Sequence, residues 1–164
     1  MKGIRIGQGF DVHRFNAGRP LKLCGHTIPG EPGLEGHSDA DVGLHAVTDA
    51  ILGALAQGDM GDHFPDSDSR WGEADSASFI SRAIEIAATG GFALVNCDLT
   101  FIGERPRIAP HRESLRASLA KVLGVPLSTV SVKATTTEGL GFVGRTEGLA
   151  AMAVVLLAWE GDDE

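Results

Sequence analysis

Three side chains in the first third of the chain have the types and spacing of a catalytic metal site. Asp11 and His13 are two residues apart in a stretch that reads as extended, so both side chains point to the same side. His45 follows in an amphipathic segment and adds a second imidazole. Two imidazoles and one carboxylate, with a fourth coordination position left open, are typical of a catalytic rather than a structural zinc.

The segment 37–49 carries polar side chains at every fourth residue. These residues are His37, Asp41, His45 and Asp49. In a helix they share one face, and the apolar residues between them face the core. Ser38 followed by Asp41 matches a capping box, so we expect a helix that begins there and ends near Gly58. For Asp41 a helix cap and a role in orienting a ligand are about equally supported.

Two downstream segments are candidates for substrate binding. The stretch 58–68 is rich in turn formers, and within it Asp59 and Asp66 are better candidates for binding hydroxyl groups than the solvated Asp62 and His63. Residues 70–75 read as a continuation of this stretch that acts as a lid.

A hydroxyl-rich strand end suits an oxyanion. Residues 135–138 supply three threonines and a glutamate, and the glycine-rich segment 139–145 ends in the fixed cation of Arg145. A threonine-rich β edge without a ligand is about as well supported by these residues alone.

The elements that must position these side chains predict an α+β fold. Strands are expected at 4–13, 21–28, 94–101, 130–134 and 149–159, the last as a central strand or one buried by another subunit, and further helices at 76–89 and 111–123. Val95 and Val122 are expected to face inward, whereas 31–36 and 103–110 are expected to be loops. We expect one domain over 1–164, with a mixed sheet, helices covering one face, and 160–164 as a disordered tail.

Charge and composition exclude some partners. The formal net charge is -8 and no basic run occurs, which argues against a nucleic-acid partner. An anionic small substrate is compatible with this charge where metal ions supply positive charge locally. No apolar run has membrane length and no signal peptide is evident, so no membrane partner is expected. The isolated Cys24 and Cys97 suit reduced thiols in the cytoplasm.

Four motifs taken together resemble the 2-C-methyl-D-erythritol 2,4-cyclodiphosphate synthase family. They are Gly-Gln-Gly-Phe-Asp-Val-His at 7–13, His-Ser-Asp-Ala-Asp at 37–41 with His-Ala-Val-Thr-Asp-Ala at 45–50, Gly-Asp-Met-Gly at 58–61 with Phe-Pro-Asp-Ser-Asp at 64–68, and Ala-Thr-Thr-Thr-Glu at 134–138 with Gly-Phe-Val-Gly-Arg-Thr-Glu-Gly at 141–148. The match covers about 4–157 in order and in spacing, which makes the combination far more specific than any one motif.

The resemblance implies a metal-dependent phosphorus–oxygen lyase of the non-mevalonate isoprenoid pathway. Such an enzyme converts 4-diphosphocytidyl-2-C-methyl-D-erythritol 2-phosphate to the cyclic diphosphate and CMP. It is a homotrimer with active sites between subunits. The family pattern places one zinc per site on Asp11, His13 and His45, with Mg²⁺ or Mn²⁺ between Glu138 and the substrate diphosphate.

The same resemblance assigns roles to further residues. His37 and Thr136 resemble the transition-state stabilisers, 59–68 the methylerythritol pocket and 103–109 the cytidine pocket. An isoprenoid diphosphate is implied in the central cavity of the trimer. The implied substrate-binding residues are Asp11, His13, His37, Ser38, Asp59, Gly61, Phe64, Asp66, Asp68, Gly103, Pro106, Arg107, Ala109, Thr135, Thr136, Thr137, Glu138, Phe142 and Arg145.

The chemistry that this substrate requires agrees with the residues. Its own 2-phosphate is the nucleophile, so the protein has to supply in-line positioning and to neutralise charge. Two dications on an acidic protein do so as a clamp and Lewis acid. The alternatives are a generic zinc-dependent phosphoesterase and a trimeric isoprenoid-binding module with a structural zinc.

Overall fold

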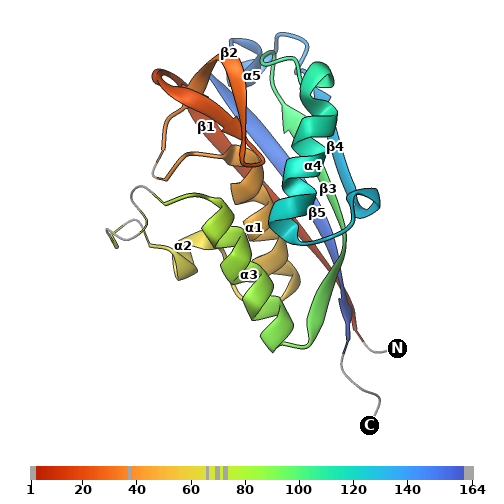
Figure 1. Cartoon of the computed structure of the whole chain (residues 1–164). Helices are drawn as coiled ribbons and strands as arrows, with labels where there is room; N and C mark the ends of the chain where they lie inside the picture. Colours follow the sequence, from red (N-terminus) through yellow and green to blue (C-terminus); the bar gives the residue numbers. More distant parts are fainter. Residues whose placement is uncertain (1–2, 37, 66, 69–70, 72–73, 161–164) are drawn as a thin grey trace.

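A mixed sheet with the strand order β2-β1-β5-β3-β4 is the frame of the computed structural model, which describes residues 3–36, 38–65, 67–68, 71 and 74–160 (Figure 1). The strands within these residues are β1 Ile4–Leu23, β2 His26–Leu34, β3 Phe92–Ile102, β4 Val130–Thr135 and β5 Gly148–Trp159. All neighbours run antiparallel except β3 and β4, which are parallel and joined through a helix. The expectation that the last strand is central in the sheet is thus confirmed.

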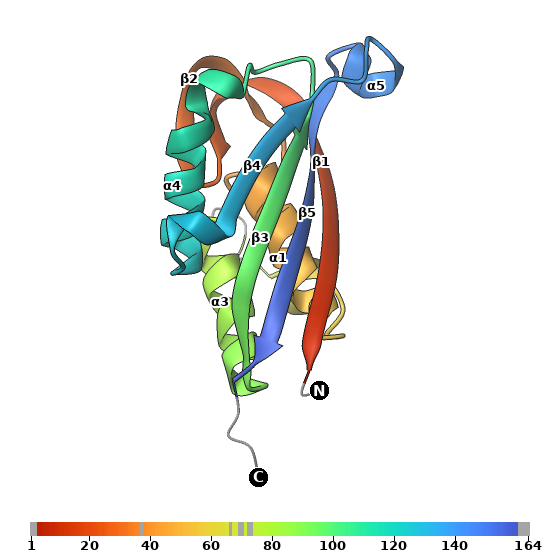
Figure 2. The same cartoon turned by 90° about the vertical axis from the view of Figure 1, so that its right-hand side faces the viewer.

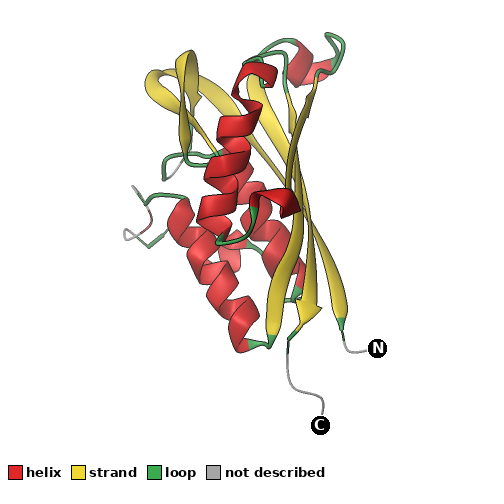
Figure 3. Ribbon diagram, turned by 45° about the vertical axis from the view of Figure 1, so that its right-hand side comes forward, coloured by secondary structure: helices red, strands yellow, loops and turns green. Residues whose placement is uncertain are grey.

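Three long helices lie against one side of this sheet (Figures 2 and 3). They are α1 Val42–Ala54, α3 Ala77–Thr89 and α4 Arg112–Leu123. Shorter elements are α2 Met60–His63, α5 Gly141–Gly144, and the 3-10 turns η2 Ala109–His111 and η3 Leu127–Thr129. Within the described part of the chain, none of the helices has the length and apolar character needed to cross a bilayer.

Helix α1 packs almost directly on the backbone of β1. A Cβ added at Gly7 would lie 1.8 Å from the Ala50 carbonyl oxygen, and one added at Gly9 would lie 1.9 Å from that of Ala46. Glycine is therefore required at both positions for the close approach of strand and helix. Because side chains alternate along a strand, the odd-numbered Asp11 faces α1 as well.

On the opposite face of the sheet, several apolar side chains of β1 and β5 are exposed in the single chain. Ile4, Ile6 and Phe10 of β1 are 67%, 70% and 49% exposed, and Met152 of β5 is 42% exposed. Phe10 and Met152 are direct partners in the β1–β5 register, and Ile4 and Ile6 lie on the same face of β1. Scattered single apolar residues are normal on a protein surface, but a contiguous patch marks a contact surface.

The first helix begins later than the periodicity predicted. Ser38 and Ala40 have φ angles of 60° and 54°, which no right-handed helix accommodates, and α1 starts at Val42. Asp41 is the N-cap, and its carboxylate accepts hydrogen bonds from the N–H groups of Leu44, Cys24 and Gly25. The predicted capping box is therefore wrong. The helix also ends at Ala54 rather than near Gly58.

Several other predicted boundaries are wrong. Strand β1 continues for 20 residues instead of stopping near His13, and β2 extends through most of the expected loop at 31–36. Val95 is 41% exposed because an irregularity between Leu94 and Asn96 turns it away from the core. Residues 58–68 contain α2, and 103–110 leads into η2. Val122, by contrast, packs against the core as expected, although it is only half-buried.

The remaining elements match the prediction. The structure is α+β, with the helices at 77–89 and 112–123 within a residue or two of the expected bounds. Of the expected tail at 160–164, only Glu160 lies among the described residues. Of the expected lid at 70–75, the described residues are Trp71, Ala74 and Asp75.

Candidate functional site

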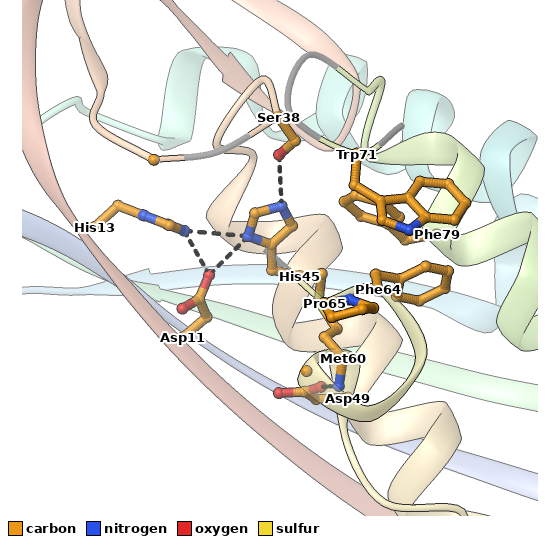
Figure 4. A pocket seen from close by; sticks show the side chains of 12 residues that line it. Asp11, His13, Ser38, His45, Asp49, Met60, Phe64, Pro65, Trp71 and Phe79 are labelled. Carbon is orange, nitrogen blue, oxygen red and sulfur yellow. Dashed lines mark hydrogen bonds and ion pairs between the residues drawn. The ribbon is translucent and has the colours of Figure 1, made fainter. Parts of the chain in front are cut away.

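Asp11, His13 and His45 converge where β1 faces the first turns of α1 (Figure 4). The Asp11 Oδ2 atom lies 2.8 Å from His13 Nε2 and 3.0 Å from His45 Nδ1. The two imidazole nitrogens lie 3.1 Å from each other. Three potential ligand atoms thus form a small triangle at the mouth of a cavity.

This triangle fits a zinc ion. Ligand atoms around a tetrahedral zinc, at bond lengths of about 2.0–2.1 Å, are separated by roughly 3.3 Å. The three atoms lie within a few tenths of an ångström of that separation. Among the described residues, this is the one group of three or more histidine, cysteine, aspartate or glutamate side chains with ligand atoms mutually within 4.8 Å.

The backbone fixes the orientation of the His13 ring. His13 Nδ1 lies 2.7 Å from the carbonyl oxygen of Glu35, which can only accept a hydrogen bond. Nδ1 therefore carries a proton, and Nε2 is the ring atom that faces the triangle and would bind a metal ion there. The His45 ring has the reverse orientation: its Nδ1 faces the triangle, and its Nε2 lies 2.9 Å from Ser76 Oγ and 3.2 Å from Ser38 Oγ.

Burial and mutual charge set the protonation of this group. Burial alone raises the pKa of Asp11, but hydrogen bonds and positive charge from His13 and His45 outweigh it and hold that pKa below its usual range. Burial lowers the pKa of His13, but the hydrogen bond and charge of Asp11 outweigh it and raise that pKa above 6.5. A metal ion would replace the proton that the metal-free group retains.

A cavity of about 480 Å³ adjoins the triangle. Its lining residues are Asp11, His13, Gly36, Ser38, His45, Asp49, Met60, Gly61, Phe64, Pro65, Trp71 and Phe79. Phe64 packs on Phe79 and Trp71 at ring-centroid distances of 4.6 and 5.1 Å, forming an aromatic wall (Figure 4). Carboxylates on one side and aromatic rings on the other suit a small molecule with a charged end and a carbon skeleton.

Only some of the expected substrate-binding residues line this cavity. Asp11, His13, Ser38, Gly61 and Phe64 do. Asp59 is instead exposed as the N-cap of α2, where it accepts a hydrogen bond from the Asp62 N–H at 3.3 Å. Asp68 is half-buried and is not among the lining residues. His37 and Asp66 lie outside the described residues.

A second cluster joins the 103–109 loop to the end of β4. Glu104 Oε1 accepts hydrogen bonds from the N–H groups of Thr137 and Gly139, both at 3.2 Å. Thr136 Oγ1 donates to Glu138 Oε1 at 3.3 Å, and both side chains are exposed. The expected residues found in these two segments are Gly103, Pro106, Arg107, Ala109, Thr135, Thr136, Thr137 and Glu138. None of them lines the cavity beside the triangle.

Phe142 and Arg145 lie elsewhere again, in and after α5. Phe142 lines a hollow of about 290 Å³ together with Val12, His13, Arg14, Glu147 and Gly148. Arg145 Nε forms an ion pair with Glu147 Oε1 at 2.6 Å. Among the described residues, the predicted site residues therefore lie partly beside the triangle, partly in the second cluster and partly beside this hollow, and His13 lines both the cavity and the hollow.

Sequence reasoning missed part of the cavity. The sequence predicts Ser76 only as the first residue of the helix at 76–89, and nothing in it links Ser76 to His45, which is 31 residues away. Phe79 was assigned to the apolar face of its helix, and it is indeed buried, but its ring also lines the cavity. Met60 lies within the 58–68 stretch and Trp71 shortly after it, and the sequence gives no further reason to expect either side chain in the cavity.

A family model, a curated relative and a solved structure all relate this chain to the same family. The model of the YgbB family matches residues 4–158. A 2-C-methyl-D-erythritol 2,4-cyclodiphosphate synthase from Geobacillus kaustophilus is 58% identical over 94% of this chain and 98% of its own length. A solved structure of a 2C-methyl-D-erythritol-2,4-cyclodiphosphate synthase in its CDP-bound form superposes with a TM-score of 0.86 at 40% identity, covering 93% of this chain and 99% of that one.

Other relatives are longer than this chain. A bifunctional enzyme IspD/IspF from Hyphomonas neptunium is 58% identical over 96% of this chain, but that match covers only 42% of the relative. The chain thus spans less than half the length of such bifunctional relatives.

Proposed function

This chain belongs to the YgbB family, and from that premise we propose that it converts 4-diphosphocytidyl-2-C-methyl-D-erythritol 2-phosphate to 2-C-methyl-D-erythritol 2,4-cyclodiphosphate with release of CMP. The observation that carries the proposal is the triangle of Asp11, His13 and His45 beside a cavity of small-molecule size. In this reaction an oxygen of the 2-phosphate forms a bond to the β-phosphorus, and the bond from that phosphorus to the CMP oxygen breaks.

Asp11, His13 and His45 would hold zinc, one ion per active site. When bound, the ion supplies Lewis-acid stabilisation of negative charge on a phosphoryl oxygen. Three protein ligands leave the fourth position open to the substrate. A cation at this point also offsets the carboxylates of Asp11 and Asp49, which would otherwise repel a phosphate.

The cavity would bind the methylerythritol portion. The aromatic wall of Phe64, Trp71 and Phe79 offers apolar surface to its carbon skeleton and excludes water. Ser38 and Gly61 line the same cavity, where they would form hydrogen bonds to the hydroxyl groups of the methylerythritol. Such a fixed pose brings the 2-phosphate and the diphosphate in line, which is the main requirement of this reaction.

The second cluster would bind the nucleotide and the diphosphate. Arg105, Arg107 and Ala109 of the 103–109 loop are exposed, which leaves the loop accessible to a cytosine base, and the exposed Glu138 suits a Mg²⁺ or Mn²⁺ ion that it would share with the diphosphate. Thr136 presents a hydroxyl next to Glu138, where it would stabilise charge on the transferring phosphorus. His37 is proposed for the same role, as the family resemblance implies.

We place the two halves of the active site on neighbouring subunits of a homotrimer. Among the described residues, the cavity and the second cluster have no residue in common within one chain. The uncovered apolar patch of Ile4, Ile6, Phe10 and Met152 supports association through this face of the sheet. An isoprenoid diphosphate would occupy the centre of the trimer, near Arg145. A cytoplasmic location accords with the two buried, unpaired cysteines.

Phosphorus NMR of the reaction products tests the proposal. With zinc and magnesium present, the substrate should yield the two coupled resonances of a cyclic diphosphate together with CMP. Asp11→Asn should abolish this conversion, and His26→Ala, in the β1–β2 hairpin, should not. Formation of an open-chain phosphate product would instead show a zinc-dependent phosphoesterase, and absence of turnover would favour a binding module.

A further inference from the structure

The contacts of Ser76 limit where its single hydroxyl proton can lie. Ser76 is fully buried at the start of α3, and its Oγ contacts both Asp39 Oδ1 and His45 Nε2, the latter at 2.9 Å. The other groups around the Asp39 carboxylate are donors, namely the Ser76 and Asp41 N–H groups and the ammonium of Lys22. A carboxylate among donors accepts hydrogen bonds, so the Ser76 proton points to Asp39.

The tautomer of His45 follows from this arrangement. Because Ser76 donates to Asp39, its oxygen can only accept from His45 Nε2. His45 then carries a proton on Nε2, and Nδ1, the ring atom that faces Asp11 and His13, is left to bind the metal. Ser38 Oγ also lies near Nε2, but at the longer distance of 3.2 Å, and it accepts from the Ala40 N–H rather than donating to a carboxylate.

We propose that Ser76 and Asp39 are positioning residues that hold His45 in the Nε2–H tautomer and thereby aim Nδ1 at the metal. The chain of hydrogen bonds runs from His45 to Ser76 to Asp39, which is 14% exposed and lies beside Lys22. It does for His45 what the Glu35 carbonyl does for His13. Partners of this kind orient a ligand and raise its basicity. The inference rests on the proposed zinc site.

A measurement on the unmodified protein tests the tautomer directly. Long-range ¹H–¹⁵N correlation spectra of the zinc-loaded protein, with ¹⁵N-labelled histidine, should show His45 protonated at Nε2 and metal-bound at Nδ1. Zinc bound through Nε2 of His45 would overturn the inference. A protein that binds no zinc at all would overturn the metal centre, and with it this role of Ser76.

A pair of serine variants on the same helix tests the positioning role. Ser76→Ala should raise the zinc dissociation constant about 10- to 100-fold and change the visible spectrum of the cobalt-substituted protein. Ser78→Ala is the matched control, since Ser78 is exposed in the same first turn and its Oγ donates to the Asp75 carbonyl at 2.7 Å. Two results would overturn the positioning role of Ser76 while leaving the metal site intact. Either Ser76→Ala binds zinc as tightly as a zinc-binding wild type, or both variants lose the same amount of zinc affinity.

A double variant tests whether Asp39 acts through the serine. Asp39→Asn should weaken zinc binding in the wild-type background and should have no further effect in a Ser76→Ala background, because the two residues form one chain to His45. Losses that simply add would contradict a shared path.

Discussion

His13 and His45 face each other through different ring nitrogens, with Nε2 of His13 lying 3.1 Å from Nδ1 of His45. Asp11 Oδ2 lies within 3.0 Å of both nitrogens. The rings come from a strand and a helix whose backbones are brought together by Gly7 and Gly9. The geometry of this metal site therefore depends on the packing of α1 against β1 as much as on the ligands.

Removal of one ligand should separate metal binding from folding. His45→Ala is expected to eliminate stoichiometric zinc and turnover together, because two remaining protein ligands cannot hold the ion against water. The α-helical circular dichroism should persist, since the α1 core is otherwise unchanged. Metal analysis of the purified variant checks this, with His26→Ala as the control that retains zinc. Zinc retained in full by His45→Ala would remove this residue from the ligand set.

The hydroxyl of Thr136 should act on the rate rather than on affinity. In Thr136→Val we expect kcat to fall by roughly a hundredfold, the ~3 kcal/mol of one lost oxyanion donor, with KM almost unchanged. Steady-state kinetics measures both, and Thr89→Val, whose hydroxyl bonds within α3, should match the wild type. A raised KM with unchanged kcat would assign Thr136 to ground-state binding.

A methyl group between β1 and α1 should damage fold and metal site together. Gly9→Ala places its Cβ 1.9 Å from the Ala46 carbonyl oxygen, so strand and helix must separate, at a cost of about 3 kcal/mol or more. Zinc affinity should fall in parallel because His45 moves with α1. Gly53→Ala, on the α1 side of the same contact, is the control, since its Cβ would lie 3.9 Å from the nearest atom, the Gln8 carbonyl oxygen. That variant should gain about 0.5–1 kcal/mol from helix propensity.

Urea unfolding of the two glycine variants, with zinc titrations alongside, measures these effects. Equal stability of Gly9→Ala and Gly53→Ala would contradict the close approach of α1 and β1.

Asp41 should make the folded protein less stable as the pH rises. Burial raises the pKa of its carboxyl group to about 6, from 3.8, although three backbone N–H groups oppose that rise. The folded protein then binds this proton more tightly than the unfolded chain does, so the stability that the group contributes is greatest below about pH 4 and is lost as the pH rises through about 6.

Asp41→Asn lacks this titration. The stability of the wild type relative to Asp41→Asn should therefore decrease by on the order of 3 kcal/mol between about pH 4 and pH 7. Denaturant unfolding of both proteins across this range measures the difference. An advantage of the wild type that grows with pH would show that the three N–H donors, and not burial, control the carboxylate.

Part of the candidate metal site could be predicted from the sequence because that part depends on local geometry. Alternation along a strand places Asp11 and His13 on one side, and the motif that contains His45 lies in a strongly apolar segment. The helix start was misplaced for an equally local reason. Spacing of four residues from 37 onward suggests a helix, but the positive φ angles of Ser38 and Ala40 and the cap at Asp41 delay it.

Other features depend on contacts that no local pattern contains. Ser76 is a fully buried partner of His45 only because α3 packs beside α1. The exposure of Val95 follows from a strand irregularity that simple alternation cannot anticipate. Gly7 and Gly9 carry no mark of their role, since a glycine in a strand indicates close approach only once its neighbour is known.

The central claim is that Asp11, His13 and His45 hold a dication whose fourth position faces a phosphate. An anomalous difference map at the zinc edge, from a crystal grown with zinc and CDP, tests it directly. We predict one peak between Asp11 Oδ2, His13 Nε2 and His45 Nδ1, with a diphosphate oxygen as the fourth ligand. A fourth protein side chain on the metal, or no peak between these atoms, would contradict the account.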